Sequence, residues 1–225
     1  MKKKVVSFAL SLCLAFSMLG VDVSAKDSQE SIASVHTAFV EGERVTVKIS
    51  PKAVGKVSKK QLDAIAKQAG NGTITIHNVH EAEQPINTAS ISWTTVKKIS
   101  SRDNPEAAKQ IISVARGATK KITKNFTHKT LRSVTLTGGV SVPSGASHSI
   151  SGSITNEVSR SYTVEETWNG PAETSSFLSR IYYYTGFLDY GTFTTEGRQS
   201  TTTYGPYKGS YQEPTHYVEW SRDIK

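Results

Sequence analysis

The chain has 225 residues and a formal net charge of +8, and this length is enough to bury a sizeable hydrophobic core. A hydrophobic content of 36% and a charged content of 20% exclude a protein with many membrane-spanning helices, a collagen-like repeat and an intrinsically disordered chain. Ser and Thr together make up 54 of the 225 residues, and the single Cys excludes an internal disulfide framework and a thiolate zinc site.

The first 25 residues have the features of a secretory signal peptide. Lysines at positions 2–4 precede an apolar run of about 15 residues, and Val23-Ser24-Ala25 has the small-residue pattern of a cleavage site. The run is shorter than the roughly 20 residues that a membrane-spanning helix needs, and a retained N-terminal anchor is the alternative. We therefore predict a secreted protein, extracellular or associated with the cell surface, that is cut after Ala25 and then contains no cysteine or methionine.

The predicted mature chain divides into two halves of different composition. Residues 26–125 have a charge balance of +7 and two aromatic residues, whereas residues 126–225 have a balance of −1 and 15 aromatic residues. The predicted fold class is α+β: a small basic α/β module, followed by an aromatic, Ser/Thr-rich all-β module that forms an elongated antiparallel β-sheet or β-sandwich. No Pro/Gly-rich linker separates the halves, so two domains and two layers of one fold both stay open.

Strand and helix signals alternate in the first half. Apolar residues at every second position predict a strand over residues 44–49. Ser58 and Gln61 have the spacing of a capping box, and apolar residues at helical spacing lead from them to Gly70, so we expect a helix here. Two further strands are expected, over residues 73–79 and 90–99.

A second helix is expected to begin near residue 104. Asp103 or Asn104 as the N-cap and Pro105 as the first helical residue are typical of a helix start. The residues expected on its apolar side are Ala108, Ile111, Ile112, Ala115 and Ala118.

Alternation with a period of two dominates the second half. From residue 149 to residue 168 every odd position is polar, and six of the ten even positions are large and apolar. This pattern predicts one unusually long strand, with a bulge at Gly152 or Asn156. Residues 133–142 alternate in the same way, and residues 143–146 predict the turn between the two strands.

We therefore predict a long amphipathic hairpin over residues 134–164. Its apolar face would consist of Val134, Leu136, Val140, Val142, Ile150, Ile154, Val158, Tyr162 and Val164. Further strands are expected over residues 176–184, 187–195 and 215–221.

No pattern indicates a catalytic or metal site. His77 and His80 would need helical spacing to face one metal ion, and they lie at a predicted strand end. No G-x-S-x-G motif occurs, and the neighbouring Glu165 and Glu166 point to opposite strand faces, although an acid–base pair can also come from distant strands. We expect a protein without enzymatic activity, metal or cofactor.

Two sets of side chains are candidates for binding. A basic run suits an anionic membrane surface or cell-wall polymer, the alternative being a solvated helix face: Arg116, Lys120, Lys121, Lys124 and Lys129. Three tyrosines in a turn-rich segment suit contact with a glycan or a membrane interface, the alternative being packing within a sheet: Tyr204, Tyr207 and Tyr211. No nucleic-acid recognition motif occurs, so we expect no nucleic-acid partner.

The Ser/Thr-rich hairpin that leads into residues 161–168, followed by residues 171–174 and an aromatic strand, resembles small secreted β-proteins of Gram-positive bacteria. Over residues 129–195 the pattern is also similar to the aerolysin-like pore-forming toxins. That resemblance implies an amphipathic hairpin, here residues 134–164, which inserts into a membrane after oligomerisation. Asn156 and Arg160 depart from the pattern because they fall on the otherwise apolar face, where an arginine at mid-bilayer costs about 2–4 kcal/mol.

Two functions follow from these observations. The first is a secreted, non-enzymatic protein that binds cell-wall polymer, glycan or an anionic membrane surface. The alternative is a membrane-active toxin that oligomerises through the 134–164 hairpin. The two functions differ in what packs over the even-numbered residues from 150 to 168. A second sheet over these residues would make the hairpin structural, whereas a thin, detachable cover would favour membrane insertion.

Overall fold

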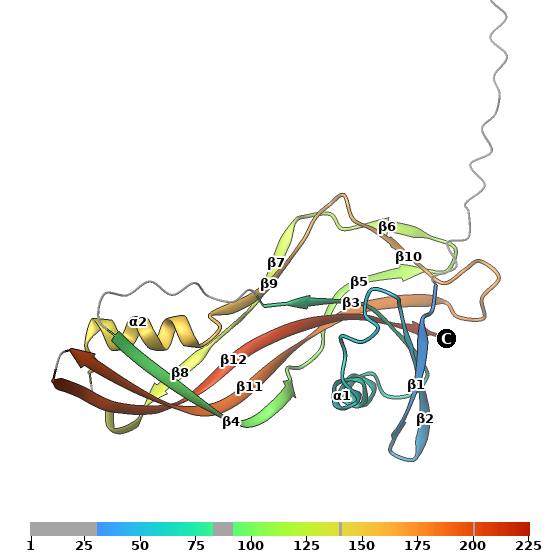
Figure 1. Cartoon of the computed structure of the whole chain (residues 1–225). Coiled ribbons are helices and arrows are strands. Elements are labelled where there is room, and N and C mark those ends of the chain that lie inside the picture. Colours follow the sequence, from blue (N-terminus) through green and yellow to red (C-terminus); the bar gives the residue numbers. More distant parts are fainter. Residues whose placement is uncertain (1–30, 83–91, 140, 200) are drawn as a thin grey trace, which may run out of the picture.

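The computed structural model describes residues 31–82, 92–139, 141–199 and 201–225, which form an elongated, β-rich protein (Figure 1). About 60% of these residues lie in strands and 13% in helices. The helices are α1 (Lys59–Ala69), α2 (Ser144–Ser153) and a 3₁₀ turn (Thr137–Gly139). The strands are β1 (Ser34–Val40), β2 (Glu43–Ile49), β3 (Thr73–Glu81), β4 (Ser92–Pro105), β5 (Lys109–Ala115), β6 (Thr119–Lys121), β7 (Phe126–Leu131), β8 (Ser133–Leu136), β9 (Glu157–Tyr162), β10 (Thr167–Asn169), β11 (Ser179–Gln199) and β12 (Thr202–Ile224).

The long antiparallel hairpin of β11 and β12 is the central feature (Figure 1). Its strands have 21 and 23 residues and would each extend roughly 70 Å at about 3.3 Å per residue. Register shifts after Phe187 and after Thr195 interrupt the pairing, and Pro214, which has no N–H to donate, lies at the first of them. The strands expected over residues 176–184 and 187–195 are joined in one continuous strand, β11, because residues 185 and 186 also pair with β12.

One mixed sheet contains strands from both compositional halves of the chain. Its order is β1-β2-β3-β12-β11-β4, with β5 also paired to β11 and β8 to β12. The pairing of β2 with β3 is parallel and the chain crosses between them through α1, whereas the other pairs in this sheet are antiparallel. Two small pairs, β6–β10 and β7–β9, form an outer layer against it.

The first helix and its flanking strands lie where the sequence indicates. The predicted strands over residues 44–49 and 73–79 fall within β2 and β3. The hydroxyl of Ser58 accepts a hydrogen bond from the backbone N–H of Gln61, and the Gln61 side chain accepts one from the N–H of Ser58, which is the capping box. The strand expected over residues 90–99 overlaps β4, although residues 90 and 91 lie outside the described residues.

The helix expected near residue 104 is wrong. Residues 92–105 form one long strand that ends at Pro105, and residues 109–115 form β5, which pairs with β11. The reason lies in the side chains. Ile111, Ile112 and Val114 are branched at Cβ, which favours a strand, and Ile112 and Val114 are buried when the segment is extended.

The predicted hairpin over residues 134–164 is also wrong. After β8 the chain forms the 3₁₀ turn and then α2, so residues 143–146 are the start of a helix rather than a turn between strands. The apolar residues of α2 explain the difference: Ala146, Ile150 and Ile154 are four residues apart, a spacing that fits one helix face as well as alternate strand positions. All three are buried at 5% exposure or less.

The hairpin β11–β12 contributes to each of four hydrophobic clusters found among the described residues. The largest cluster surrounds α1 and β1–β3, the second lies between β5 and the β6–β10 pair, the third lies under α2 and the fourth under β9. The hairpin residues in these clusters are Phe187, Val218 and Trp220 in the first, Tyr182 in the second, Phe193 and Tyr211 in the third, and Tyr184 and Tyr217 in the fourth.

Candidate functional site

The residues expected on one hairpin face are distributed over several environments. Val134 and Val164 are 36% and 40% exposed, Leu136 and Val142 are half-buried, and Val140 lies outside the described residues. The others are buried in three different clusters: Ile150 and Ile154 under α2, Val158 against Tyr184 and Tyr217, and Tyr162 with Trp168 and Tyr182. They therefore do not form a single apolar stripe in this structure.

Helix α2 and the turn that follows it, residues 144–155, cover one face of the β4–β11–β12–β8 part of the sheet, and we call them the cover segment. Seven of the ten residues of α2 are Ser or Gly, which are weak helix formers, and no side chain caps its N-terminus. Its stability must therefore come from contacts with the sheet. Ile150 and Ile154 supply the apolar part of these contacts by packing on Phe193 and Tyr211.

Polar contacts add to the attachment of the cover segment. The hydroxyl of Thr95 lies 2.9 Å from that of Ser149 and 2.8 Å from that of Thr195. Beyond the helix, the N–H of Thr155 donates to the Glu213 carboxylate, which also forms a 2.9 Å ion pair with Lys97.

Arg132 holds the other end of α2. Its guanidinium donates to the carbonyl oxygens of Ser151 and Ile154, at 3.0 and 3.2 Å, and to the Ser151 hydroxyl. These carbonyls belong to the end of the helix, where backbone oxygens lack helical partners.

A buried ionic cluster joins the outer layer to the sheet. The Glu219 carboxylate of β12 accepts hydrogen bonds from His80 and Arg160, each at 3.1 Å, and Arg160 also pairs with Glu166 at 2.9 Å. Burial alone would raise the pKa of Glu219, but the hydrogen bond and charge of His80 and the charge of Arg160 outweigh it and lower that pKa. The sequence places Arg160 on the otherwise apolar face of the predicted hairpin, whereas in this structure Arg160 forms ion pairs with Glu219 and Glu166.

Two histidines are held in their neutral form by their surroundings. The ring of His128 lies against that of Tyr184 in a tilted arrangement with ring centres 4.1 Å apart, and burial and the nearby Lys109 lower its pKa. His216 stacks on Phe187 at 5.1 Å, and burial lowers its pKa against the opposing charges of nearby carboxylates.

The predicted basic residues are all exposed, but they do not form one helix face. Lys120 and Lys121 lie in β6, Lys124 follows it, and Lys129 lies in β7. Lys129 is 3.3 Å from Glu157, and Arg116 donates to the carbonyl of Ser175; within the described part of the chain, no ion pair involves the other three.

The three candidate tyrosines lie in β12, not in a loop as expected from the turn residues. Tyr204 is 37% exposed, and its ring centre and that of Tyr207 lie 6.1 and 6.2 Å from that of Trp93. Tyr211 is 2% exposed and faces the cover segment, so only the first two are brought together.

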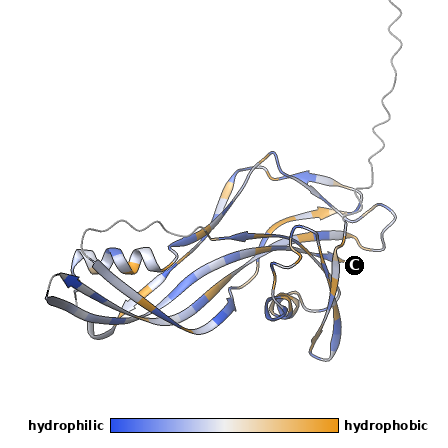
Figure 2. Ribbon diagram, viewed as in Figure 1, coloured by the Kyte–Doolittle hydropathy of each residue, from blue (hydrophilic) through white to orange (hydrophobic). Residues whose placement is uncertain are grey.

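A polar face lies on the side of the four-stranded region opposite the cover segment. Strand register places its side chains together, since Thr192 pairs with both Lys98 and Ser210, and Ser210 pairs with Thr135. Figure 2 shows hydrophobic segments gathered near α1 and its neighbouring strands, while this end of the sheet is mainly pale or blue. The face comprises Thr94, Val96, Lys98, Tyr190, Thr192, Thr194, Lys208, Ser210, Gln212, Ser133 and Thr135.

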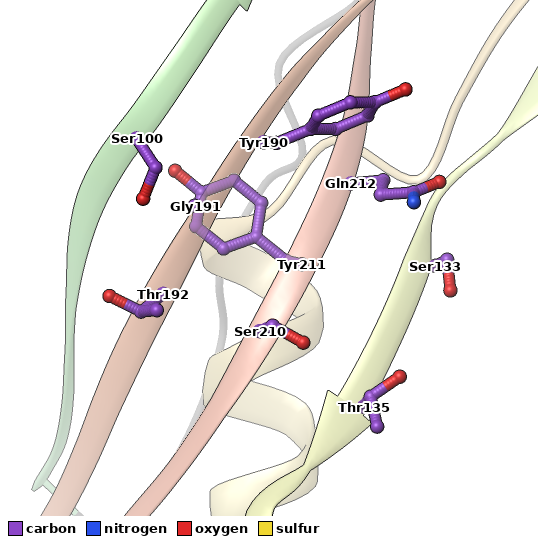
Figure 3. A pocket seen from close by; sticks show the side chains of 9 residues that line it. All are labelled: Ser100, Ser133, Thr135, Tyr190, Gly191, Thr192, Ser210, Tyr211 and Gln212. Atoms are coloured by element: carbon purple, nitrogen blue, oxygen red, sulfur yellow. The ribbon is translucent and has the colours of Figure 1, made fainter.

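A trough of about 360 Å³ crosses the polar face. Its lining comes from four adjacent strands, so it is an open hollow on the surface of the sheet rather than a hole between two layers (Figure 3). Gly191 and Tyr211 contribute to its lining. The other lining residues are Ser100, Ser133, Thr135, Tyr190, Thr192, Ser210 and Gln212.

The polar side chains of the trough have no hydrogen-bonding partner among the residues that the structure describes. No described residue hydrogen-bonds to the hydroxyls of its serines and threonines, to the Tyr190 hydroxyl or to the Gln212 amide. None of the nine described lining residues is charged. The trough therefore offers uncharged donors and acceptors to a ligand, and we take it as the candidate functional site.

Sequence reasoning predicted a strand over residues 187–195, which contains Tyr190, but missed the trough. The usable signal was alternation: Tyr190, Thr192 and Thr194 stand at every second position of one strand, and Ser210 and Gln212 do so on the next. What the sequence did not provide was the pairing that brings β4 and β8 to the two sides of the hairpin.

His77 and His80 have different partners. His77 contacts the hydroxyl of Ser221, whereas His80 contacts Glu219, so they do not face one site. In the described ranges no group of three or more His, Cys, Asp or Glu side chains is placed to hold a metal ion. None of the described helices is long and apolar enough to cross a bilayer.

The chain matches no protein-family model, no curated protein and no solved structure.

Proposed function

We propose that this chain is a secreted, non-enzymatic protein that binds the cell envelope or an extracellular ligand through the polar face of its long sheet. The observation that carries the proposal is the trough, whose polar side chains have no hydrogen-bonding partner among the described residues. Ligand pockets of about 300–1,000 Å³ with a few convergent polar groups are the usual binding sites of proteins, and this trough lies at the lower end of that range at about 360 Å³.

The outer layer would assist such binding without determining it. Lys120, Lys121 and Lys124 are exposed and would attract an anionic envelope polymer at low salt. Contacts of this kind weaken as salt screens them, whereas hydrogen bonds to an uncharged trough do not. Salt dependence therefore separates the two contributions.

The test is a pull-down on purified bacterial cell wall at low and high salt, with two matched variants. Ser210→Arg places a long side chain in the trough, and Ser159→Arg adds the same charge at an exposed hydroxyl of β9 in the outer layer. We expect S210R to reduce the binding that persists at high salt by on the order of tenfold, and S159R to leave it unchanged. Failure of the natural chain to bind at low salt, or equal binding by the two variants, would refute the proposal.

The second candidate function is the membrane-active one, now placed on the cover segment. Its support is specific: α2 consists largely of Ser and Gly, and its buried residues also fit the alternate positions of a strand. The segment follows β7 and precedes β9, which pair antiparallel from Leu131 opposite Glu157 onward, so an extended cover segment would continue that pair.

Vesicle leakage tests this alternative. Calcein-loaded anionic liposomes should leak with the natural chain and stay intact when a disulfide joins Thr95→Cys to Ser149→Cys, with leakage restored by reduction. Absence of leakage and of SDS-resistant oligomers with the natural chain would remove the alternative and leave envelope binding in place.

A further inference from the structure

We propose that the trough binds a neutral saccharide, with one sugar ring lying on the face of Tyr190 and its hydroxyls paired with the surrounding side chains. The inference rests on the proposed binding function and names the ligand class of the same site.

The absence of charge in the lining points to an uncharged ligand. None of the nine residues that line the trough is Asp, Glu, Lys, Arg or His. A carboxylate, phosphate or ammonium that entered it would lose water without gaining an opposite charge, which is unfavourable. The lining thus disfavours the anionic polymers that the lysines of the outer layer attract.

The hydrogen-bonding groups match those of a sugar. Serine and threonine hydroxyls both donate and accept, and the Gln212 amide offers two N–H donors and a carbonyl acceptor. They stand on both sides of the hairpin, with Ser100 from β4 on one side and Thr135 from β8 on the other (Figure 3). A ligand that carries hydroxyls around a ring can pair with both sides, whereas an acyl chain would leave these groups without partners.

Tyr190 supplies the apolar contact that a sugar ring also needs. Its side chain is half-buried, it borders the trough beside Gln212, and it stacks on no aromatic ring among the residues described (Figure 3). A tyrosine presents a flat apolar ring with a polar tip, and the C–H face of a pyranose fits such a surface. A sugar ring on Tyr190 would therefore have both apolar and polar contacts.

The open shape of the trough favours a sugar unit that is part of a longer polysaccharide. The lining strands β4, β11, β12 and β8 lie side by side, so the trough opens onto the surface of the sheet, where a ligand longer than one ring can extend beyond it. A polysaccharide can cross the sheet surface and place one ring at Tyr190.

The experiment uses two soluble probes, the hexasaccharide of β-1,4-linked N-acetylglucosamine and that of β-1,4-linked glucose, with binding to the full chain measured by titration calorimetry. The two probes distinguish an N-acetylated source from a plain glucan. We expect one of them to bind, with Tyr190→Ala weakening binding about tenfold and Tyr190→Phe, which keeps the ring, remaining close to the natural chain.

Two further variants keep the result decisive. Gln212 is an exposed residue of the trough, so Gln212→Ala should also weaken binding of the hexasaccharide. Thr94 lies on the polar face outside the trough, so Thr94→Ala should leave that binding unchanged. Equal affinities for Y190A and T94A, or binding of neither hexasaccharide by a chain that still binds cell wall, would overturn the saccharide inference and leave the proposed function standing. Loss of both kinds of binding in the natural chain would overturn both.

Discussion

A disulfide between the cover segment and β4 should stabilise this protein strongly, because it would close a long loop across a contact that already exists. The hydroxyls of Thr95 and Ser149 are 2.9 Å apart although the residues are 54 positions apart in the chain. Replacing both by Cys in a Cys13→Ser background leaves these two thiols as the only ones. Loop-closure entropy for a loop of this length corresponds to about 4 kcal/mol of unfolding free energy.

The measurement compares urea unfolding of the oxidised and reduced forms of this one variant, so the loss of the Thr95 hydrogen bonds affects both forms equally. A matched variant, Thr95→Cys with Ser147→Cys, places the second thiol on the exposed side of α2 and should not oxidise to a bridge. If the Thr95–Ser149 pair does not form a bridge, or if the bridge changes the unfolding free energy by less than about 1 kcal/mol, then α2 does not pack on β4 as described.

Three further outcomes are expected. Arg160→Met should lower the free energy of unfolding by about 2–3 kcal/mol in a urea titration, because it removes the arginine that pairs with the buried Glu219; an unchanged midpoint would mean that this ion pair adds nothing. Lowered histidine pKa values make the folded state bind fewer protons than the unfolded state, so stability should be full above the usual value of 6.5 and fall below it. Replacing His128 by Phe keeps the ring packing and should flatten this decline between about pH 7.5 and about pH 5.5, and an equally steep decline would assign it to other groups. Gly170→Ala should cost about 1–3 kcal/mol in the same titration, because the added Cβ would overlap a backbone carbonyl oxygen that cannot move as a flexible side chain would; a neutral result would contradict the close approach at this position.

Local signals predicted the first part of the fold well. The capping box at Ser58 and Gln61 and the apolar spacing up to Gly70 fix α1 by interactions within a few residues, and the structure has the same helix and the same box. The alternation over residues 44–49 likewise indicates the buried face of β2, because Val45, Val47 and Ile49 are buried in the same hydrophobic cluster as the apolar residues of α1.

The spacing of apolar residues led to a wrong secondary-structure prediction where the same pattern fits both a helix and a strand. Positions 146, 150 and 154 are separated by four residues, a multiple of two and close to one helical turn, so alternation could not distinguish a strand from α2. The deciding influence is the surface formed by Phe193 and Tyr211, which are distant in sequence. Near residue 109 the helical spacing was misleading in the same way, and pairing with β11 prevailed.

The candidate site was less predictable than the fold. Its side chains are ordinary serines, threonines and one tyrosine, and only the register between four strands places them together. The expected tyrosine set illustrates the limit, because the rings of Tyr204 and Tyr207 lie near Trp93, whereas Tyr211, four residues further along β12, packs in the cluster under α2.

The position of β12 in the sheet determines when the protein can fold. This strand is the last in the chain but lies between β3 and β11, and Ile74 pairs with Arg222. Until the C-terminal residues are present, β3 has no partner on that side and the core around α1 lacks Val218 and Trp220. Because these contacts join residues that are far apart in the sequence, β3 and the core around α1 can reach this arrangement only after the residues of β12 have been synthesised.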